Sequence, residues 1–350
     1  MAIHMTMAFG DNPRVEALKD GTVKPEGIDL EIVTIHGGAL FYRNLAYDEF
    51  DATEMSISET LLARERRDAI GNGKWDWSAL PVFLSRGHMW SGLYVNTDSG
   101  INSLADLKGK RIAVPDYDMT AALWMRNTLK DLYGIEASDN TWFNARTKEH
   151  SHGGALGLHL PEWKVQGVEH SFYTVDQTQD VALERGEIDA CTVLQTSGTV
   201  TAGDPTVIDR YGGTQMKDNP KIKQLVPDGG WELIREYYRK TQFHHVNHNV
   251  VVQNRILNEH PWVAMELYHA FERSKQVAYQ RARDSQSGYL FMGGKEFQEQ
   301  AEVFGDDPYP IGLKKMGKNI ERAIQGSVEH GLLRRPLALD EVYFHTTLGT

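Results

Sequence analysis

Two turns in the sequence carry polar side chains where a predicted strand runs into a predicted helix. The first is Glu54-Met55-Ser56-Ile57-Ser58-Glu59, and the second is Pro115-Asp116-Tyr117-Asp118-Met119-Thr120. Free backbone N–H groups and the positive end of the helix dipole make such a turn a candidate carboxylate site. The alternative is a purely structural role as helix caps for Ser56, which has capping-box spacing to Glu59, and for Asp118. If both turns face one cleft, they hold a small acid from opposite sides.

Arg86 follows an apolar strand, in the segment Ser85-Arg86-Gly87-His88. A guanidinium at a strand end binds a carboxylate through two parallel hydrogen bonds. The alternative for Arg86 is an ion pair on the protein surface. The residue type and its position make Arg86 a further candidate for holding an anionic ligand.

Three histidines, His244, His245 and His248, cluster just before or within a strand predicted over 246–252. A metal site here would need further ligands, with Glu149-His150-Ser151-His152 as the candidate source, and none of the usual zinc spacings is present. We therefore expect no metal. Because imidazole titrates near neutral pH, a general acid or base role for one of these histidines is the preferred interpretation.

The motifs of several common enzyme classes are missing from the sequence. It has no glycine-rich phosphate loop of the Walker type, no Gly-x-Gly-x-x-Gly after a strand and no nucleophile-elbow pattern. These absences predict a function that uses no nucleotide cofactor and no hydrolase triad. Cys191 is the one cysteine, and we interpret it as a small buried hydrophobic residue.

The composition is that of a globular protein with a small ligand. The 350 residues are 41% hydrophobic and 24% charged, with a net charge of −11 and no run of lysines or arginines. Nucleic-acid binding is not expected, because phosphate neutralisation needs clustered positive charge. No stretch approaches the roughly eighteen apolar residues of a membrane span. Residues 1–10 lack the features of a secretory signal, so we expect a cytoplasmic protein with no membrane partner.

Short apolar strands alternate with amphipathic helices along most of the chain, which is typical of an α/β fold. Strands are predicted at 5–9, 27–33, 50–55, 80–84, 92–96, 141–144, 191–194 and 246–252, and a further strand ends at residue 114. The strands at 80–84 and 92–96 are predicted to pair with each other. The main helices are predicted at 14–19, 41–46, 59–67, 119–133 and 179–185. This order indicates that 1–98 forms the first part of lobe 1, 99–200 forms an inserted lobe 2, and 201–350 returns to lobe 1 and adds C-terminal helices.

Two phrases resemble those of type II periplasmic-binding-protein folds. The segment LADLKGKRIAV, residues 104–114, is similar to the entry into the second lobe of these folds, and Gly186-Glu187-Ile188-Asp189-Ala190 is similar to its closing strand. The resemblance implies a two-lobed, type II periplasmic-binding-protein-like α/β fold with a ligand cleft between the lobes.

Nearly the whole chain resembles the 4,5-dihydroxyphthalate decarboxylase family, whose enzymes are built on this fold. The most specific stretch is Val114-Pro115-Asp116-Tyr117-Asp118-Met119-Thr120-Ala121, followed by Trp124 and Arg126. His248 falls on the family's strand histidine. Where the family pattern has Phe-Arg-His, this chain reads His88-Met89-Trp90, so one arginine and one histidine of the expected pocket wall are missing.

The resemblance implies a homo-oligomeric carboxy-lyase that needs no cofactor. Its substrate would be a small aromatic carboxylate, either 4,5-dihydroxyphthalate or a related hydroxylated acid, and the reaction would proceed by protonation of a ring carbon. The implied catalytic residues are His248, Glu54 and Arg86, and the implied substrate-binding residues are Ser56, Ser58, His88, Tyr117, Thr120 and Arg126. The alternatives are an aromatic-acid solute-binding protein of a transporter and an enzyme of this fold that acts on another small acid.

Overall fold

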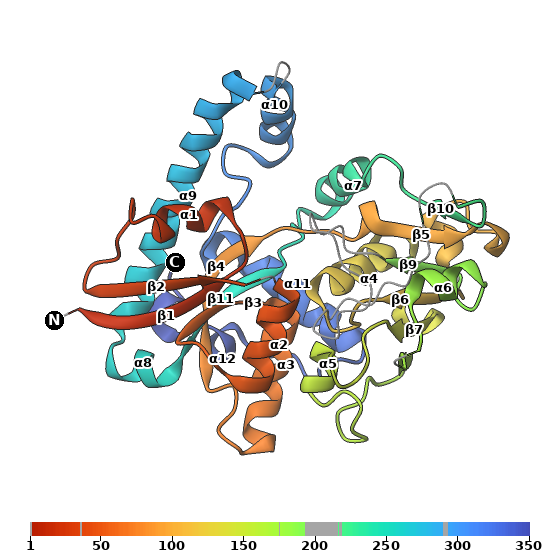
Figure 1. Ribbon diagram of the computed structural model, residues 1–350, viewed down its shortest axis with the longest axis horizontal. Coiled ribbons are helices and arrows are strands. Elements are labelled where there is room, and N and C mark those ends of the chain that lie inside the picture. Colours follow the sequence, from red (N-terminus) through yellow and green to blue (C-terminus); the bar gives the residue numbers. More distant parts are fainter. Residues whose placement is uncertain (1, 36, 175, 193–215, 217–218, 290–292) are drawn as a thin grey trace.

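The computed structural model describes residues 2–35, 37–174, 176–192, 216, 219–289 and 293–350. Its strands form two β-sheets, one in each of two lobes (Figure 1). The first sheet has the strand order β2-β1-β3-β11-β4, and the second has the order β10-β5-β9-β6-β7-β8. This is the two-lobed α/β arrangement that the sequence predicts.

The first sheet carries one strand that runs against its parallel neighbours. β1 (Ile3–Phe9) is parallel to β2 (Ile28–Thr34) and β3 (Ala52–Ser56), whereas β11 (His248–Gln253) lies antiparallel between β3 and β4 (Trp77–Ser85). Continuous apolar runs such as Val250-Val251-Val252 are buried because helices cover the sheet. The helices of this lobe include α1 (Pro13–Lys19), α2 (Gly37–Tyr47), α3 (Ile57–Ile70), α8 (Asn254–Glu259) and α9 (Trp262–Tyr289).

The second sheet has a parallel centre and an antiparallel edge. β6 (Arg111–Val114) is parallel to β7 (Thr141–Asn144) and β9 (Ala190–Thr192), and β7 is parallel to β8 (Glu169–Phe172). β5 (Leu93–Asn96) is antiparallel to β9 and to β10 (Ile222–Gln224). The carboxyl ends of β6 and β7 lead into α4 (Thr120–Tyr133) and α5 (His152–Ala155), and α6 (Gln179–Glu184) precedes β9. Strand ends of this kind are where open α/β sheets bind ligands.

Between its described strands, the chain crosses from one sheet to the other twice. Because β4 belongs to the first sheet and β5 to the second, the predicted pairing of 80–84 with 92–96 is wrong. The alternating apolar pattern of each segment defines a strand but not its neighbour. The return crossing contains α7 (Trp231–Thr241) and ends at β11. By sheet membership we place the lobe boundaries within 86–92 and 225–247, and the division at 98/99 and 200/201 stays a prediction.

One hydrophobic core runs through both lobes. It joins buried side chains of α3, α4 and α11 (Leu313–Glu329), among them Leu61, Trp124 and Ile320. The buried residues of α11 recur at helical spacing, which gives the helix one apolar face. The Trp124 indole N–H donates to the Val246 carbonyl at 2.8 Å, so α4 is also tied to the returning crossing. The two lobes are therefore packed against each other.

The remaining helices lie outside this shared core or at its rim. α9 and α10 (Gly293–Phe304) project from the first lobe, and the short α12 (Leu339–Val342) packs against α3 (Figure 1). No helix in the described part of the chain is both long and apolar enough to cross a membrane.

Gly331, just after α11, makes a close backbone contact with the second lobe. Its φ is +73°, and a Cβ at this position would lie 2.1 Å from the carbonyl oxygen of Gln166. Gly305 has almost the same φ, +74°, but open space around it. We expect Gly305→Ala to lower the free energy of unfolding by about 1 kcal/mol through the left-handed backbone alone, and Gly331→Ala to lower it by about 2–4 kcal/mol because of the added clash. Urea unfolding followed by circular dichroism measures both, and equal losses would contradict the role of the Gln166 contact.

Candidate active site

Glu54 and His248 are brought together by neighbouring strands of the first sheet. Glu54 lies on β3 and His248 begins β11, and the histidine Nδ1 is 2.7 Å from Glu54 Oε1. The Gly10 N–H donates to Glu54 Oε2 at 3.0 Å. Burial alone would raise the pKa of Glu54, but the hydrogen bond and charge of His248 and the Gly10 N–H outweigh burial and lower that pKa. Glu54 is therefore ionised at neutral pH.

An ionised carboxylate on Nδ1 fixes both the orientation and the tautomer of His248. Since Glu54 accepts, Nδ1 donates, and the tautomer is assigned from this hydrogen bond. The Phe41 ring packs edge-on against the imidazole, with centroids 4.7 Å apart. Among the described residues, no side chain or carbonyl hydrogen-bonds to His248 Nε2. Nε2 is therefore the nitrogen left open to a ligand, which is the arrangement that a general acid–base histidine requires.

The two strand-to-helix turns that were predicted to hold an anion contact each other directly. Ser56 occupies the N-cap position of α3, but its side chain makes no capping hydrogen bond to the helix. Its Oγ lies 2.9 Å from Oγ1 of Thr120, at the start of α4. The Ser58 N–H donates to the same Thr120 hydroxyl at 2.9 Å. A side chain from the second lobe thus takes the place that a carboxylate would have on the N-terminus of α3.

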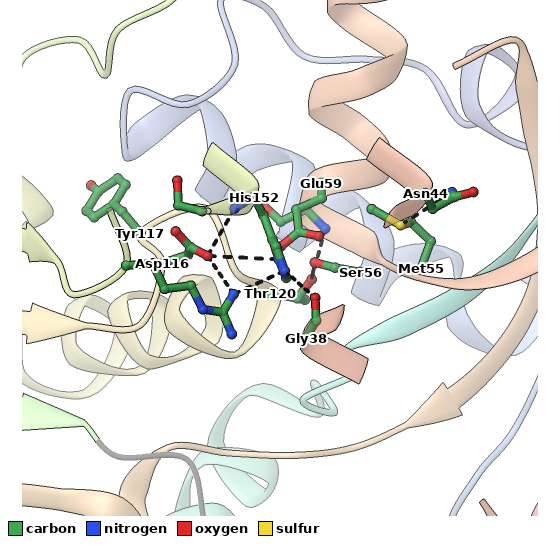
Figure 2. A network of polar contacts seen from close by, with 12 residues as sticks. Gly38, Asn44, Met55, Ser56, Glu59, Asp116, Tyr117, Thr120 and His152 are labelled. Atoms are coloured by element: carbon green, nitrogen blue, oxygen red, sulfur yellow. Dashed lines mark hydrogen bonds and ion pairs between the residues drawn. The ribbon is translucent and has the colours of Figure 1, made fainter. Parts of the chain in front are cut away.

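A buried polar network joins the lobes beside this contact (Figure 2). His152 of α5 lies between Glu59 of α3 and Asp116: its Nδ1 is 2.8 Å from Glu59 Oε1, and its backbone N–H donates to Asp116 Oδ2 at 3.2 Å. Arg146 Nη1 donates to the same Asp116 oxygen at 2.6 Å. The side chains of all four residues are 1% exposed or less. Because buried charges are stable only when they are paired, these contacts depend on the lobes staying together.

The Glu59–His152 pair holds one proton at neutral pH. Burial raises the pKa of Glu59 to about 8, whereas burial and the charge of Arg146 lower the pKa of His152. His152 Nε2 lies 2.9 Å from the Gly38 carbonyl, which only accepts, and 3.1 Å from Arg146 Nη1, which only donates, so these contacts do not fix the tautomer of the ring. Nδ1 and the protonated carboxyl group of Glu59 are in hydrogen-bond contact at 2.8 Å. The pair is therefore uncharged, with the acid on the first lobe and the base on the second.

The sequence did not predict this network, although Glu59 and His152 both lie in segments that were considered as candidate sites. Glu59 stands in the first anion-binding turn, and His152 stands in the segment considered as a source of metal ligands. Across the described ranges, no group of three or more His, Cys, Asp and Glu side chains is placed to hold a metal ion. The Glu59–His152 contact forms only when the two lobes pack together, so the spacing of residues within either segment does not predict it.

Arg86 and His88 line a cavity of about 120 Å³ between the end of β4, α7 and α10. Arg86 Nη1 contacts His244 Nδ1, and the guanidinium lies 5.3 Å from the centroid of the Tyr309 ring. Burial lowers the pKa of Arg86 to about 10, so it stays a cation at neutral pH. In the part of the chain that the structure describes, no carboxylate pairs with Arg86, so the alternative of a surface ion pair is not observed.

The cavity and the Glu54–His248 pair are connected through β4. Ser85, which precedes Arg86, is the strand partner of His248. Arg14 of α1 stacks on the Tyr309 ring at 3.7 Å, and its charge contributes to the lowered pKa of Glu54. Arg14 and Tyr309 were missed at the level of sequence, because only the fold brings them beside the end of β4.

Tyr117 and Arg126 lie in the interior of the second lobe. The Arg126 guanidinium is 3.7 Å from the centroid of the Tyr117 ring, and its Nη2 donates to the Tyr117 carbonyl at 2.8 Å. The Tyr117 hydroxyl donates to the His330 carbonyl at 3.0 Å. Both side chains are buried, and these contacts support a packing role. A substrate-binding role for Tyr117 and Arg126 stays a prediction.

Two solved structures of ligand-binding proteins share the fold. A putative periplasmic sulfonate-binding protein of Methylobacillus flagellatus superposes with a TM-score of 0.53 at 13% identity, over 99% of this chain and 93% of that one. The ligand-binding component of an import system of Staphylococcus aureus superposes with a TM-score of 0.50 at 13% identity, over 99% of this chain and 98% of that one. At this identity the likeness shows the periplasmic-binding-protein-like fold alone.

No family model matches the chain, but two relatives match it in sequence. A 4,5-dihydroxyphthalate decarboxylase of Comamonas testosteroni is 29% identical over 348 residues, which are 99% of this chain and 98% of the relative. A 4,5-dihydroxyphthalate decarboxylase of Pseudomonas putida is 32% identical over 213 residues, which are 61% of this chain and 79% of the relative. The resemblance drawn from the sequence motifs is confirmed, and the chain belongs to the 4,5-dihydroxyphthalate decarboxylase family.

Proposed function

We propose that the protein is a carboxy-lyase that removes CO₂ from a hydroxylated aromatic acid, 4,5-dihydroxyphthalate or a close relative, without oxidation. The observation that carries the proposal is the Glu54–His248 pair, in which a buried carboxylate holds an imidazole whose Nε2 contacts no described residue. The names of the two sequence relatives support the reaction and the class of substrate.

His248 supplies the proton that the reaction consumes. A ring hydroxyl donates electron density to the ring carbon that bears the leaving carboxylate, and this carbon takes a proton from His248 Nε2. The bond between the ring carbon and the carboxylate then breaks, its electron pair restores the aromatic ring, and CO₂ leaves. His248 regains a proton from solvent. Glu54 orients the imidazole and stabilises its protonated form.

The other predicted site residues fall into two groups with different roles in this proposal. Arg86 holds a carboxylate, and His88 lines the same cavity. Ser56, Ser58 and Thr120 close the contact between the lobes, which keeps water from the reacting groups. A cytoplasmic location and a homo-oligomeric assembly stay predictions.

The experiment that tests the function is a turnover assay on a panel of acids. Purified protein is incubated with hydroxylated phthalates and benzoates while CO₂ release is followed. We expect turnover of 4,5-dihydroxyphthalate or of a closely related hydroxylated acid. Tight binding across the panel with no CO₂ release would instead favour the solute-binding alternative.

His248→Ala should lower kcat by at least about 100-fold, because a positioned general acid contributes about 10²–10⁴-fold to a rate. Glu54→Gln should also lower kcat, since a neutral amide does not stabilise the protonated imidazole. The matched control is His4→Ala, at a histidine of β1 whose side chain is 59% exposed. This control should keep the wild-type rate. A loss of less than about tenfold in folded His248→Ala protein would contradict the proton-donor role.

The Glu59–His152 pair predicts how stability changes with pH. Between the ordinary values of 4.5 for Glu59 and 6.5 for His152, the raised pKa of Glu59 lowers stability as pH rises, whereas the lowered pKa of His152 raises it, so the two contributions oppose each other. From pH 6.5 to about 8 only the folded pair keeps its proton, so stability falls as pH rises, by about 2 kcal/mol.

Glu59→Gln should remove the loss of stability between pH 6.5 and 8, because an amide keeps a donor for His152 Nδ1 and cannot ionise. Asp116 and Asp118 also face this network, and their pKa values are raised first by burial and further by Glu59, a contribution that Glu59→Gln removes. Urea midpoints measured across this pH range for wild type, Glu59→Gln and the exposed control Glu16→Gln give the comparison. Parallel curves for wild type and Glu59→Gln would refute the one-proton arrangement.

A further inference from the structure

Arg86 presents the edge of its guanidinium that suits a carboxylate, and that edge is unoccupied by protein groups. Nη1 is engaged by His244 Nδ1. Nε and Nη2 are buried and have no hydrogen-bond partner among the described residues. These two N–H groups form the fork that binds both oxygens of a carboxylate. A buried cation without a counterion is costly, so the site favours an anion.

His245 offers an unpaired acceptor to the same cavity. The Thr128 hydroxyl donates to the Trp124 carbonyl at 2.8 Å, so its oxygen accepts from His245 Nε2 at 3.1 Å. The hydrogen of the ring is therefore on Nε2, and Nδ1 keeps its lone pair. Nδ1 is buried without a partner in the described structure. Burial, with the neighbouring His88 and Arg86, lowers the pKa of His245 to about 3, so the ring stays neutral. A phenolic O–H is the group that satisfies this nitrogen.

The size and lining of the cavity suit one aromatic ring. Its volume is about 120 Å³, and an apolar cavity of roughly 150 Å³ is known to hold benzene. The walls are mainly aromatic, and include Tyr238 and Phe304, whose ring centroids lie 4.9 Å apart. Such rings pack against a bound ring through offset or edge contacts.

We infer that this cavity is the ring-binding site of the protein, with a carboxylate on the Nε and Nη2 edge of Arg86 and a ring hydroxyl donating to His245 Nδ1. The inference rests on the proposed function for the identity of the ligand, and it adds the place of binding and the groups that select it. It also assigns the carboxylate. A guanidinium stabilises a carboxylate and so opposes its conversion to neutral CO₂. Arg86 therefore holds a carboxylate that the reaction leaves on the ring.

The product keeps this anchor and should bind to the same cavity. Loss of one carboxylate from 4,5-dihydroxyphthalate gives 3,4-dihydroxybenzoate, which retains one carboxylate and both hydroxyls. We expect 3,4-dihydroxybenzoate to bind in calorimetric titrations and to inhibit competitively. 3,4-Dimethoxybenzoate, which cannot donate to His245, and benzoate should bind at least about tenfold more weakly.

Variants of the cavity separate this inference from a general loss of structure. Ile234→Trp fills the cavity from α7 and should weaken binding of 3,4-dihydroxybenzoate at least about 30-fold, whereas the matched Ile234→Val should bind as wild type does. Arg86→Met should abolish detectable binding. His248→Ala should keep binding while losing turnover, since the carboxylate and the ring hydroxyl are held by Arg86 and His245. Circular dichroism spectra of each variant check that it is folded.

The possible outcomes distinguish the site from the reaction. Selective binding that Ile234→Trp removes, without CO₂ release from any acid, supports the cavity and overturns the proposed function. CO₂ release with KM unchanged in folded Ile234→Trp supports the function and overturns the cavity. Equal binding of 3,4-dimethoxybenzoate and 3,4-dihydroxybenzoate to the wild-type protein overturns the role of His245, even if every variant of the cavity fails to fold.

Discussion

Arg146, Asp116, His152 and Glu59 meet with almost no exposed surface, and each needs the others for its charge state. The first three come from the second lobe, and Glu59 comes from the first, so the network is complete only when the lobes are packed together. The shared hydrophobic core of α3, α4 and α11 supplies that packing. The Glu59–His152 hydrogen bond and the burial of apolar surface therefore depend on the same relative position of the lobes.

Two glutamates on one strand-to-helix unit have opposite protonation states. Glu54 is ionised because a protonatable imidazole and a backbone N–H contact its oxygens, and Glu59 is protonated because burial dominates and its partner His152 is neutral. Carboxyl groups that sit in contrasting environments are a common way of dividing roles within a site. Here Glu54 orients the His248 imidazole, and Glu59 joins the lobes.

Much of the fold could be predicted from the sequence, because periodicity is a local property. The helix predicted at 119–133 is α4 (Thr120–Tyr133), and the strand predicted at 141–144 is β7. The neighbour of the strand at 92–96 could not be predicted, since strand pairing is a long-range choice. Within the site, Glu54 and His248 were identified from family motifs. The partners of Glu59 and Arg86 were not, because they come from distant segments that only the packed lobes bring together.

β11 lies in the middle of the first sheet although its residues follow the whole second lobe in the chain. During synthesis on the ribosome, the inserted lobe therefore emerges before β11 does. Until then, the backbone N–H and C=O groups of β3 and β4 that pair with β11 have no strand partner. The hydrogen-bond partner of Glu54, His248, lies 194 residues further along the chain. The strand that completes the sheet is also the one that delivers His248. A nascent or truncated chain that ends before β11 thus lacks His248, the proposed proton donor, so the proposed activity requires a complete first sheet.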